Sequence, residues 1–280
     1  MKRCVSIILL CLLVVCVRAE SALTQFRHIT AEEGLSSNHV RSLIQDSQGF
    51  IWIGTDRGLD RYDGIGYKSY HLPPQYEGTT LLTMLEDGER IWVGSNRGVF
   101  IFDRKKEELS YIDTFLSSEG EIHINERISN ITRDKEGNIW ISTFGAGAFC
   151  YNIRSEVVEK YSFPSVSDKL AGIFIDSTNQ IWAVSNWGMD MLFRLNKTTD
   201  EFEPFSLYVF NKNFNPGGLV AIEDSEKRMW IGTWEDGILE VDKSTGQIRR
   251  HLNPELGGGK SKSYPFYDGI CSGLSSDRLG

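Results

Sequence analysis

The chain has 280 residues, of which 40% are hydrophobic, 24% charged and 11% aromatic, and its formal net charge is -8 at pH 7. This composition excludes a disordered chain, a collagen-like chain and a membrane protein with many spans. A chain this acidic is also a poor candidate for binding phosphate backbones, so we expect no nucleic acid partner.

The first 19 residues have the pattern of a secretory signal peptide. Two basic residues precede an apolar run over 4–17, and the small residue Ala19 follows it. The run is shorter than the roughly 20 residues that a membrane span needs. We therefore predict a signal peptide over 1–19 that is cleaved after Ala19, and an exported mature chain. An uncleaved N-terminal anchor and a lipid-modified Cys16 are the alternatives.

Cysteines and histidines point to no metal or catalytic chemistry. Only Cys150 and Cys271 lie beyond the predicted signal peptide. Two cysteines do not form a disulfide framework, and neither Cys nor His has the spacing of a zinc site. We expect no metal, no cofactor and no catalytic residue, and we interpret Cys150 as a small buried side chain.

Five tryptophans begin copies of one repeated pattern. Each follows Ile or Met, each precedes Thr or Ser by three residues, and each has an Asp five or six residues upstream. They are separated by 40, 48, 42 and 48 residues. The five are Trp52, Trp92, Trp140, Trp182 and Trp230. This period is typical of four-stranded propeller blades.

The pattern within each repeat predicts four short strands joined by turns. We therefore predict an all-β fold, a β-propeller of four-stranded blades. The five complete blades are expected near 36–72, 80–113, 126–163, 169–207 and 217–252. An outer strand near 26–29 is expected to precede them, and a partial blade over 269–280 to follow them. The ring is expected to be incomplete, and its unpaired strand edges are an aggregation hazard.

Three repeated positions have a structural interpretation. The tryptophan ring is expected to fill the wedge between adjacent blades. The residue two positions later shares its face and is mostly small, which lets the neighbouring sheet come close. These residues are Gly54, Gly94, Ser142, Val184 and Gly232. The upstream aspartates are expected to form turns rather than a metal site, because one per blade cannot converge on one ion.

The segment Leu35–Asp63 resembles the two-component regulator propeller repeat almost completely, with L-S-S-N-x-V before the tryptophan and G-T-x-x-G-L after it. Residues 26–38 resemble the start of the periplasmic sensor region of hybrid two-component systems. The resemblance covers about 24–280. It implies recognition of an oligosaccharide in the periplasm, coupled to a phosphorelay. That family carries two propellers, a membrane helix and a histidine kinase, so this shorter chain is expected to be truncated and to lack kinase activity.

The loop after the Thr or Ser of each repeat varies most, and the five loops are expected to share one face of the propeller. Aromatic rings beside Arg, Asn and Asp suit sugars, which stack their CH faces and hydrogen-bond through hydroxyls. The candidate ligand-binding residues are Asp56, Arg57, Asn96, Arg97, Phe144, Asn186, Trp187, Trp234 and Glu235. The alternative is that Trp187 and Trp234 pack between blades.

Two classes of function remain open. The first is the ligand-sensing module of a signalling receptor, with an oligosaccharide and another propeller or receptor chain as partners. The second is a stand-alone exported propeller that binds a glycan or a protein. Contact with a membrane is expected only through an uncleaved N-terminus or a missing C-terminal part. An enzyme such as a propeller lyase is the third and weakest interpretation, because no acid–base pair recurs in the repeat.

Overall fold

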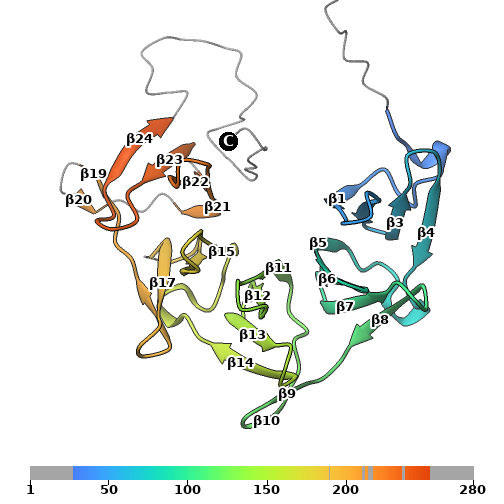
Figure 1. Cartoon of the computed structure of the whole chain (residues 1–280), viewed down its shortest axis with the longest axis horizontal. Helices are drawn as coiled ribbons and strands as arrows, with labels where there is room; N and C mark the ends of the chain where they lie inside the picture. Colours follow the sequence, from blue (N-terminus) through green and yellow to red (C-terminus); the bar gives the residue numbers. More distant parts are fainter. Residues whose placement is uncertain (1–27, 189, 210–211, 214–216, 235–236, 253–280) are drawn as a thin grey trace, which may run out of the picture.

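The computed structural model describes residues 28–188, 190–209, 212–213, 217–234 and 237–252. Five sheets stand side by side along an open arc, and the inner strand of each sheet faces the centre of the arc (Figure 1). The predicted fold class, an all-β propeller whose ring is incomplete, is confirmed for this part of the chain. The predicted signal peptide at 1–19 and partial blade at 269–280 lie outside the described residues.

Blades 1 and 2 are four-stranded antiparallel sheets whose strands follow chain order. Blade 1 contains β1 (Val40–Gln45), β2 (Ile51–Thr55), β3 (Gly58–Tyr62) and β4 (Tyr67–His71). Blade 2 contains β5 (Leu81–Asp87), β6 (Arg90–Ser95), β7 (Gly98–Asp103) and β8 (Glu108–Ile112). Two 3-10 turns accompany them, η1 (Ala31–Glu33) before β1 and η2 (Pro74–Tyr76) before β5.

Blade 3 differs from the prediction because its sheet has six strands. Its repeat forms β11 (Ile128–Arg133), β12 (Ile139–Thr143), β13 (Ala148–Asn152) and β14 (Val157–Tyr161). The connection from blade 2 adds a hairpin of β9 (Phe115–Ser117) and β10 (Gly120–Ile122). Strand β9 pairs in parallel with β14, the outermost strand of the repeat. The unpaired edge of β14 explains the addition, because it leaves a row of free backbone donors and acceptors.

Blades 4 and 5 return to four strands. Blade 4 contains β15 (Gly172–Ile175), β16 (Ile181–Val184), β17 (Leu192–Asn196) and β18 (Glu201–Pro204), and η3 (Pro164–Val166) precedes it. Blade 5 contains β21 (Gly218–Glu223), β22 (Met229–Thr233), β23 (Ile238–Val241) and β24 (Ile248–Leu252), and a small hairpin of β19 (Tyr208–Val209) and β20 (Lys212–Asn213) precedes it. In the described ranges, no helix has the length and apolar character needed to cross a membrane.

The expected outer strand near 26–29 is wrong for His28 and Ile29, the two of these residues that the structure describes. His28 and Ile29 do not belong to a strand, and 26–27 lie outside the described residues. The chain is instead anchored a few residues later on blade 1. The Ser36 hydroxyl donates a hydrogen bond to the buried Asp60 carboxylate at 2.6 Å, and the Ser36 backbone N–H donates to the same oxygen at 3.0 Å. These two bonds fix the chain to blade 1 without a strand partner.

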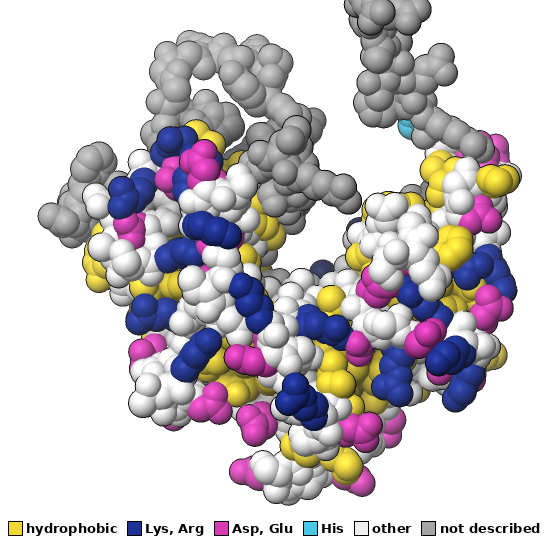
Figure 2. Space-filling model, in the orientation of Figure 1, with side chains coloured by type: hydrophobic (Ala, Val, Ile, Leu, Met, Phe, Trp, Pro, Cys, Tyr) yellow, Lys and Arg dark blue, Asp and Glu magenta, His cyan; other side chains and the backbone are white. Residues whose placement is uncertain are grey.

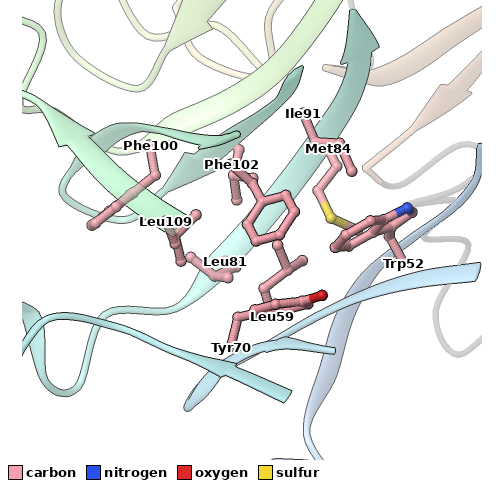
Figure 3. Packing of buried hydrophobic residues seen from close by; sticks show 10 residues of the cluster. Trp52, Leu59, Tyr70, Leu81, Met84, Ile91, Phe100, Phe102 and Leu109 are labelled. Atoms are coloured by element: carbon pink, nitrogen blue, oxygen red, sulfur yellow. The ribbon is translucent and has the colours of Figure 1, made fainter. Parts of the chain in front are cut away.

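Each blade has two faces, which we call leading (toward the preceding blade) and trailing (toward the following blade). The repeat tryptophan lies on the trailing face. Trp52 of blade 1 packs on Met84 and Phe102 of blade 2, and its ring centroid lies 4.9 Å from that of Phe102 (Figure 3). Trp92, Trp140 and Trp182 are buried in the same way against the next blade.

In blades 1 and 2, the glycine two residues after the tryptophan receives an apolar side chain from the following blade. A Cβ on Gly54 would lie 3.2 Å from the Leu81 Cβ, and a Cβ on Gly94 would lie 2.9 Å from the Ile128 Cβ. Val184 breaks the pattern, and blade 5 compensates with Gly218, where a Cβ would lie only 2.4 Å from a Val184 methyl group. The large and small partners have exchanged places between these two blades.

The leading face of blade 1 is open to solvent among the described residues. Leu43 is 60% exposed and Val40 is 45% exposed. Leu43 pairs with Ile53, the residue that directly follows the tryptophan. At the equivalent position, the other blades bury Met84, Ile131, Ile173 and Ala221. At the position of Val40, they bury Leu81, Ile128, Leu170 and Gly218. Blade 1 therefore presents two apolar positions that contact a preceding blade everywhere else in the arc.

Candidate ligand-binding face

A buried hydroxyl organises the loop between the second and third strands of every blade. In blade 1, Thr55 Oγ1 accepts hydrogen bonds from the backbone N–H groups of Arg57 and Gly58, each at 3.1 Å, and donates to the Gly58 carbonyl at 3.0 Å. The same position is held by Ser95, Thr143, Ser185 and Thr233, all fully buried. The loop backbone is thus held from below, and its side chains are left to point outward.

In blades 2, 3 and 5, the first residue of the loop is hydrogen-bonded to the segment that leads into the same blade. The N–H of Asn96 donates to the Thr80 carbonyl at 3.1 Å, and the Thr80 N–H donates to the Asn96 side chain at 2.9 Å. The N–H of Trp234 donates to the Gly217 carbonyl at 2.9 Å. The loops and the leading segments therefore lie at the same end of the blades, as the repeat predicts.

Blade 1 places a His–carboxylate pair at this end. The Asp56 carboxylate lies 2.9 Å from Nδ1 of His39. Hydrogen bonds from Ser37 and His39 hold the pKa of Asp56 below its usual value. Beside the pair is a cavity of about 680 Å³, lined by Asp56, Arg57, His71 and Glu77 among others. Sequence reasoning did not find this pair, because the two residues share no motif. His39 directly precedes β1, whereas Asp56 directly follows β2.

Blades 3 and 4 together carry an aromatic cluster at the same end. The rings of Phe144 and Trp187 meet edge to face with centroids 6.4 Å apart. The ammonium of Lys169 lies 3.7 Å from the centroid of the Trp187 ring and 5.5 Å from that of Phe144. Phe144 is 40% exposed and Trp187 is 50% exposed. Two large rings thus stay in contact with water while a cation lies against them.

The loop that carries Phe144 is shaped by the segment that carries Lys169. The N–H groups of Gly145 and Gly147 both donate to the Asp168 carbonyl, at 3.0 and 2.9 Å. A Cβ on Gly147 would lie 2.2 Å from the Tyr161 carbonyl, and its φ is +79°, so glycine is required there. The ring of Phe144 and the ammonium of Lys169 are therefore positioned by backbone contacts between two blades.

Two acceptor atoms close to this cluster have no hydrogen-bond partner. In the described part of the chain, Asn186 Oδ1 and Glu126 Oε2 are buried and unpaired. Asn186 precedes Trp187, and Glu126 approaches the loop of Phe144, since its Cγ would lie 4.0 Å from a Cβ on Gly145. A buried acceptor without a partner is unfavourable, so each atom would gain a hydrogen bond if a loop movement exposed it to a donor.

The structure brings only some of the predicted residues together. Phe144 and Trp187 are in direct contact, Asn186 adjoins them, and the exposed Trp234 connects to Asn186 through Gly217, whose Cβ would lie 3.5 Å from the Asn186 Cα. Asp56, Arg57, Asn96 and Arg97 lie on blades 1 and 2, at the same end of the arc. Glu235 lies outside the described residues.

Lys169 and Glu126 were missed by sequence reasoning. Both precede the first strand of a blade, where the repeat has no fixed residue. Their role depends on a contact between one blade and the loop of its neighbour, which spacing along the chain does not reveal.

A second cavity lies between blades 3 and 4 at the opposite end. It has a volume of about 310 Å³ and is lined by Asp134, Cys150, Tyr161, Lys197 and Asp200 among others. The Tyr161 hydroxyl donates to Asp200 at 3.1 Å. Burial raises the pKa of the Cys150 thiol to about 12, so this thiol is protonated at neutral pH and a weak nucleophile.

One face of the arc has mixed charge. On the face shown in Figure 2, basic and acidic side chains are interspersed around the arc, with hydrophobic side chains between them. No blade presents a surface of one sign on this face.

Two stretches of the chain, residues 34–57 and 123–145, match the family model named two component regulator propeller. These two stretches are therefore similar to the repeat of that family. Over 70 residues it is 34% identical to histidine kinase P4 of Formosa agariphila, a match that covers 25% of this chain and 5% of that protein.

Solved structures share the fold of these propeller repeats. The extracellular domain of a hybrid two component system from B. thetaiotaomicron has a TM-score of 0.58 and 20% identity, covering 91% of this chain and 37% of that one. Virginiamycin B lyase from Staphylococcus aureus has a TM-score of 0.57 and 14% identity, covering 74% and 68%. This chain spans well under two thirds of the curated kinase and of the extracellular domain. The fold of this chain is thus similar to that of the extracellular domain of a hybrid two component system.

Proposed function

We propose that this chain is a periplasmic ligand-sensing module of a two-component signalling receptor, and that it recognises an oligosaccharide. The observation that carries the proposal is the exposed aromatic pair of Phe144 and Trp187, with Lys169 against it, at the loop end of a propeller with regulator repeats. The similarity to extracellular domains of hybrid two-component systems supports the sensing role.

The chemistry of this cluster suits a sugar. An exposed aromatic ring offers an apolar surface for the CH face of a sugar ring, and polar groups at its edge fix the orientation. The unpaired acceptors of Asn186 and Glu126 are buried beside this cluster, so they would accept hydrogen bonds from sugar hydroxyl groups only after the loops shift to expose them. The ammonium of Lys169 supplies donors beside the same rings.

We further propose that binding is not followed by catalysis. The same fold occurs in a lyase, so the fold alone does not decide the matter. The carboxylate of Asp56 and the ring of His39 form an acid–base pair, but they lie on blade 1, apart from the rings on blades 3 and 4. We expect any bound oligosaccharide to be recovered unchanged in mass.

The test is binding of the purified chain to an array of neutral and acidic oligosaccharides, followed by titration of each positive sugar. Phe144→Ala and Trp187→Ala are expected to weaken binding at least tenfold, because each removes a stacking surface. Leu116→Ala is the matched control, since it removes an exposed apolar side chain on β9 of the hairpin. Binding that is equal in all three variants would refute this site, and absence of binding to every sugar would refute the ligand class.

A further inference from the structure

The trailing face of blade 5 repeats the features of the four interfaces within the arc. Trp230 occupies the tryptophan position, and its Nε1 donates to Asp224 at 2.8 Å, as in the other blades. Gly232 occupies the position two residues later. At the interfaces after blades 1 and 2, the equivalent glycine receives an apolar side chain from the next blade, Leu81 on Gly54 and Ile128 on Gly94. The face of blade 5 thus has the shape that accepts another such side chain.

The side chain that fills this position has a fixed place in the repeat. It is the first residue of the innermost strand and pairs with the Thr or Ser of its own blade, as Leu81 pairs with Ser95 and Ile128 with Thr143. In blade 1 this residue is Val40, which pairs with Thr55 and is preceded by the sequence G-L-S-S-N-H over 34–39. The six residues before the inserted side chain therefore have a recognisable sequence in this chain.

A similar sequence occurs once more, beyond the described residues. Residues 273–279 read G-L-S-S-D-R-L, against G-L-S-S-N-H-V for 34–40. The alignment places Leu279 at the position of Val40, with the same branched apolar character as Leu81. The preceding stretch, 253–272, connects this segment to the end of β24, the outermost strand of blade 5.

We propose that residues 273–279 dock on the trailing face of blade 5, with Leu279 seated against Gly232 and beside Trp230. The segment belongs to the same chain as the face, so its local concentration is high and docking needs no second molecule. A second copy is the competing occupant, because the exposed Val40 and Leu43 of its blade 1 have the same character. The two occupants differ in whether the contact lies within one chain or between two.

Cysteine cross-linking tests the register of this contact in the full chain. Gly232→Cys and Leu279→Cys are introduced together with Cys271→Ser, which removes a nearby competing thiol. The internal pair Gly54→Cys and Leu81→Cys is the reference, because its 3.2 Å Cβ separation is close to the roughly 3.8 Å found in disulfides. After mild oxidation, peptide mapping by mass spectrometry identifies each linked pair.

We expect the 232–279 disulfide to form within single chains, to an extent similar to the reference. A control pair with Arg278→Cys in place of Leu279→Cys is expected to form at least tenfold less, because neighbouring residues of a strand point to opposite faces. Equal linking at 278 and 279, or no linking at 279 while the reference pair forms, would overturn the proposal. Linking only between chains would assign the face to a second copy instead.

A second measurement leaves blade 5 unchanged. Leu279→Asp is expected to increase the rate of limited proteolysis within 253–280 about tenfold, because a buried carboxylate opposes docking. Leu279→Ile, which keeps the apolar volume, is expected to leave that rate within a factor of two. An unchanged rate in Leu279→Asp would contradict the proposal even where the cysteine variants fail to fold.

Discussion

The indole Nε1 of Trp52 donates a hydrogen bond to the buried carboxylate of Asp46 at 2.7 Å. The other oxygen of that carboxylate accepts the backbone N–H groups of Gln48 and Phe50, both at 2.9 Å. One side chain therefore closes the turn and orients the ring that fills the interface. The same arrangement recurs at Asp134, Asp176 and Asp224 with their tryptophans. This use of both oxygens explains the repeated aspartate without a metal.

Removal of one such carboxylate should destabilise the fold strongly. In Asp134→Ala, the Trp140 indole and two backbone N–H groups lose their acceptor inside the structure. Since an unpaired buried donor costs about 1 to 3 kcal/mol, we expect the free energy of unfolding to fall by about 2 to 4 kcal/mol. Urea unfolding followed by circular dichroism measures it. Asp113→Ala, at an exposed position, should change it by less than about 0.5 kcal/mol, and a similar small change in Asp134→Ala would contradict this account.

The exchange of large and small residues between blades 4 and 5 predicts a rescue. Gly218→Ala introduces a Cβ within 2.4 Å of a Val184 methyl group and 2.8 Å of the Met191 Cγ, so it should destabilise the chain. Val184→Ala in the same chain removes the first clash. We expect the double variant to be more stable than the sum of the single effects by about 1 kcal/mol or more. Strictly additive effects, measured by urea unfolding, would show that the two residues do not share this space.

Acid should weaken the link between blades 4 and 5. Burial disfavours the charged form of Asp176, but hydrogen bonds from Thr178, Gln180 and Lys243 outweigh it and lower the pKa to about 2, from an ordinary value of 3.8. The folded pKa lies below the unfolded one, so this carboxylate stabilises the fold above about pH 4 and the contribution is lost as the pH falls toward 2.

The measurement is urea unfolding at several pH values between 6 and 2. Lys243 also forms an ion pair with Glu223, and Lys243→Met removes both contacts. This variant should be less stable at pH 6 and should lose less additional stability on acidification than the parent chain. A parallel pH dependence in the two proteins would show that Asp176 does not gain its stability from Lys243.

Two neighbouring tryptophans should respond differently to truncation. Trp182 is buried between blades 4 and 5, whereas half of the Trp187 surface is exposed. Trp182→Ala should lower the free energy of unfolding by about 3 to 5 kcal/mol, and Trp187→Ala by less than about 1 kcal/mol. Thermal and urea unfolding of both variants measure the difference. A large loss for Trp187→Ala would mean that this ring supports the blades rather than a ligand.

The propeller could be predicted because its interfaces repeat with the chain. Trp52 and Gly54 recur in register in the later blades, so spacing alone indicates which residues meet a neighbouring sheet. The hairpin of β9 and β10 could not be predicted, since it pairs with an edge strand and follows no period. The large Val184 occupies a position that is mostly small in the other repeats, and its compensation by Gly218 depends on the contact between two blades, which the spacing of residues does not reveal.

The candidate site was less predictable than the fold. Trp187 stands out in the sequence because it lies outside the repeated pattern, but its partner Lys169 does not. That contact joins the loop of one blade to the segment leading into the same blade and to Phe144 of the preceding one. The conformation of a loop and the tilt between two sheets determine it, and neither is encoded by residue spacing.

The buried hydroxyl at the end of the second strand separates the frame of each blade from its loop surface. Thr55 and its equivalents satisfy the loop backbone from inside, so the exposed side chains carry little of the fold's stability. Exposed loop residues such as Arg57 and Trp187 can therefore each be substituted with little loss of folding stability. Exchanging a few loop side chains would therefore change the chemistry of this face while the sheets beneath it keep their structure.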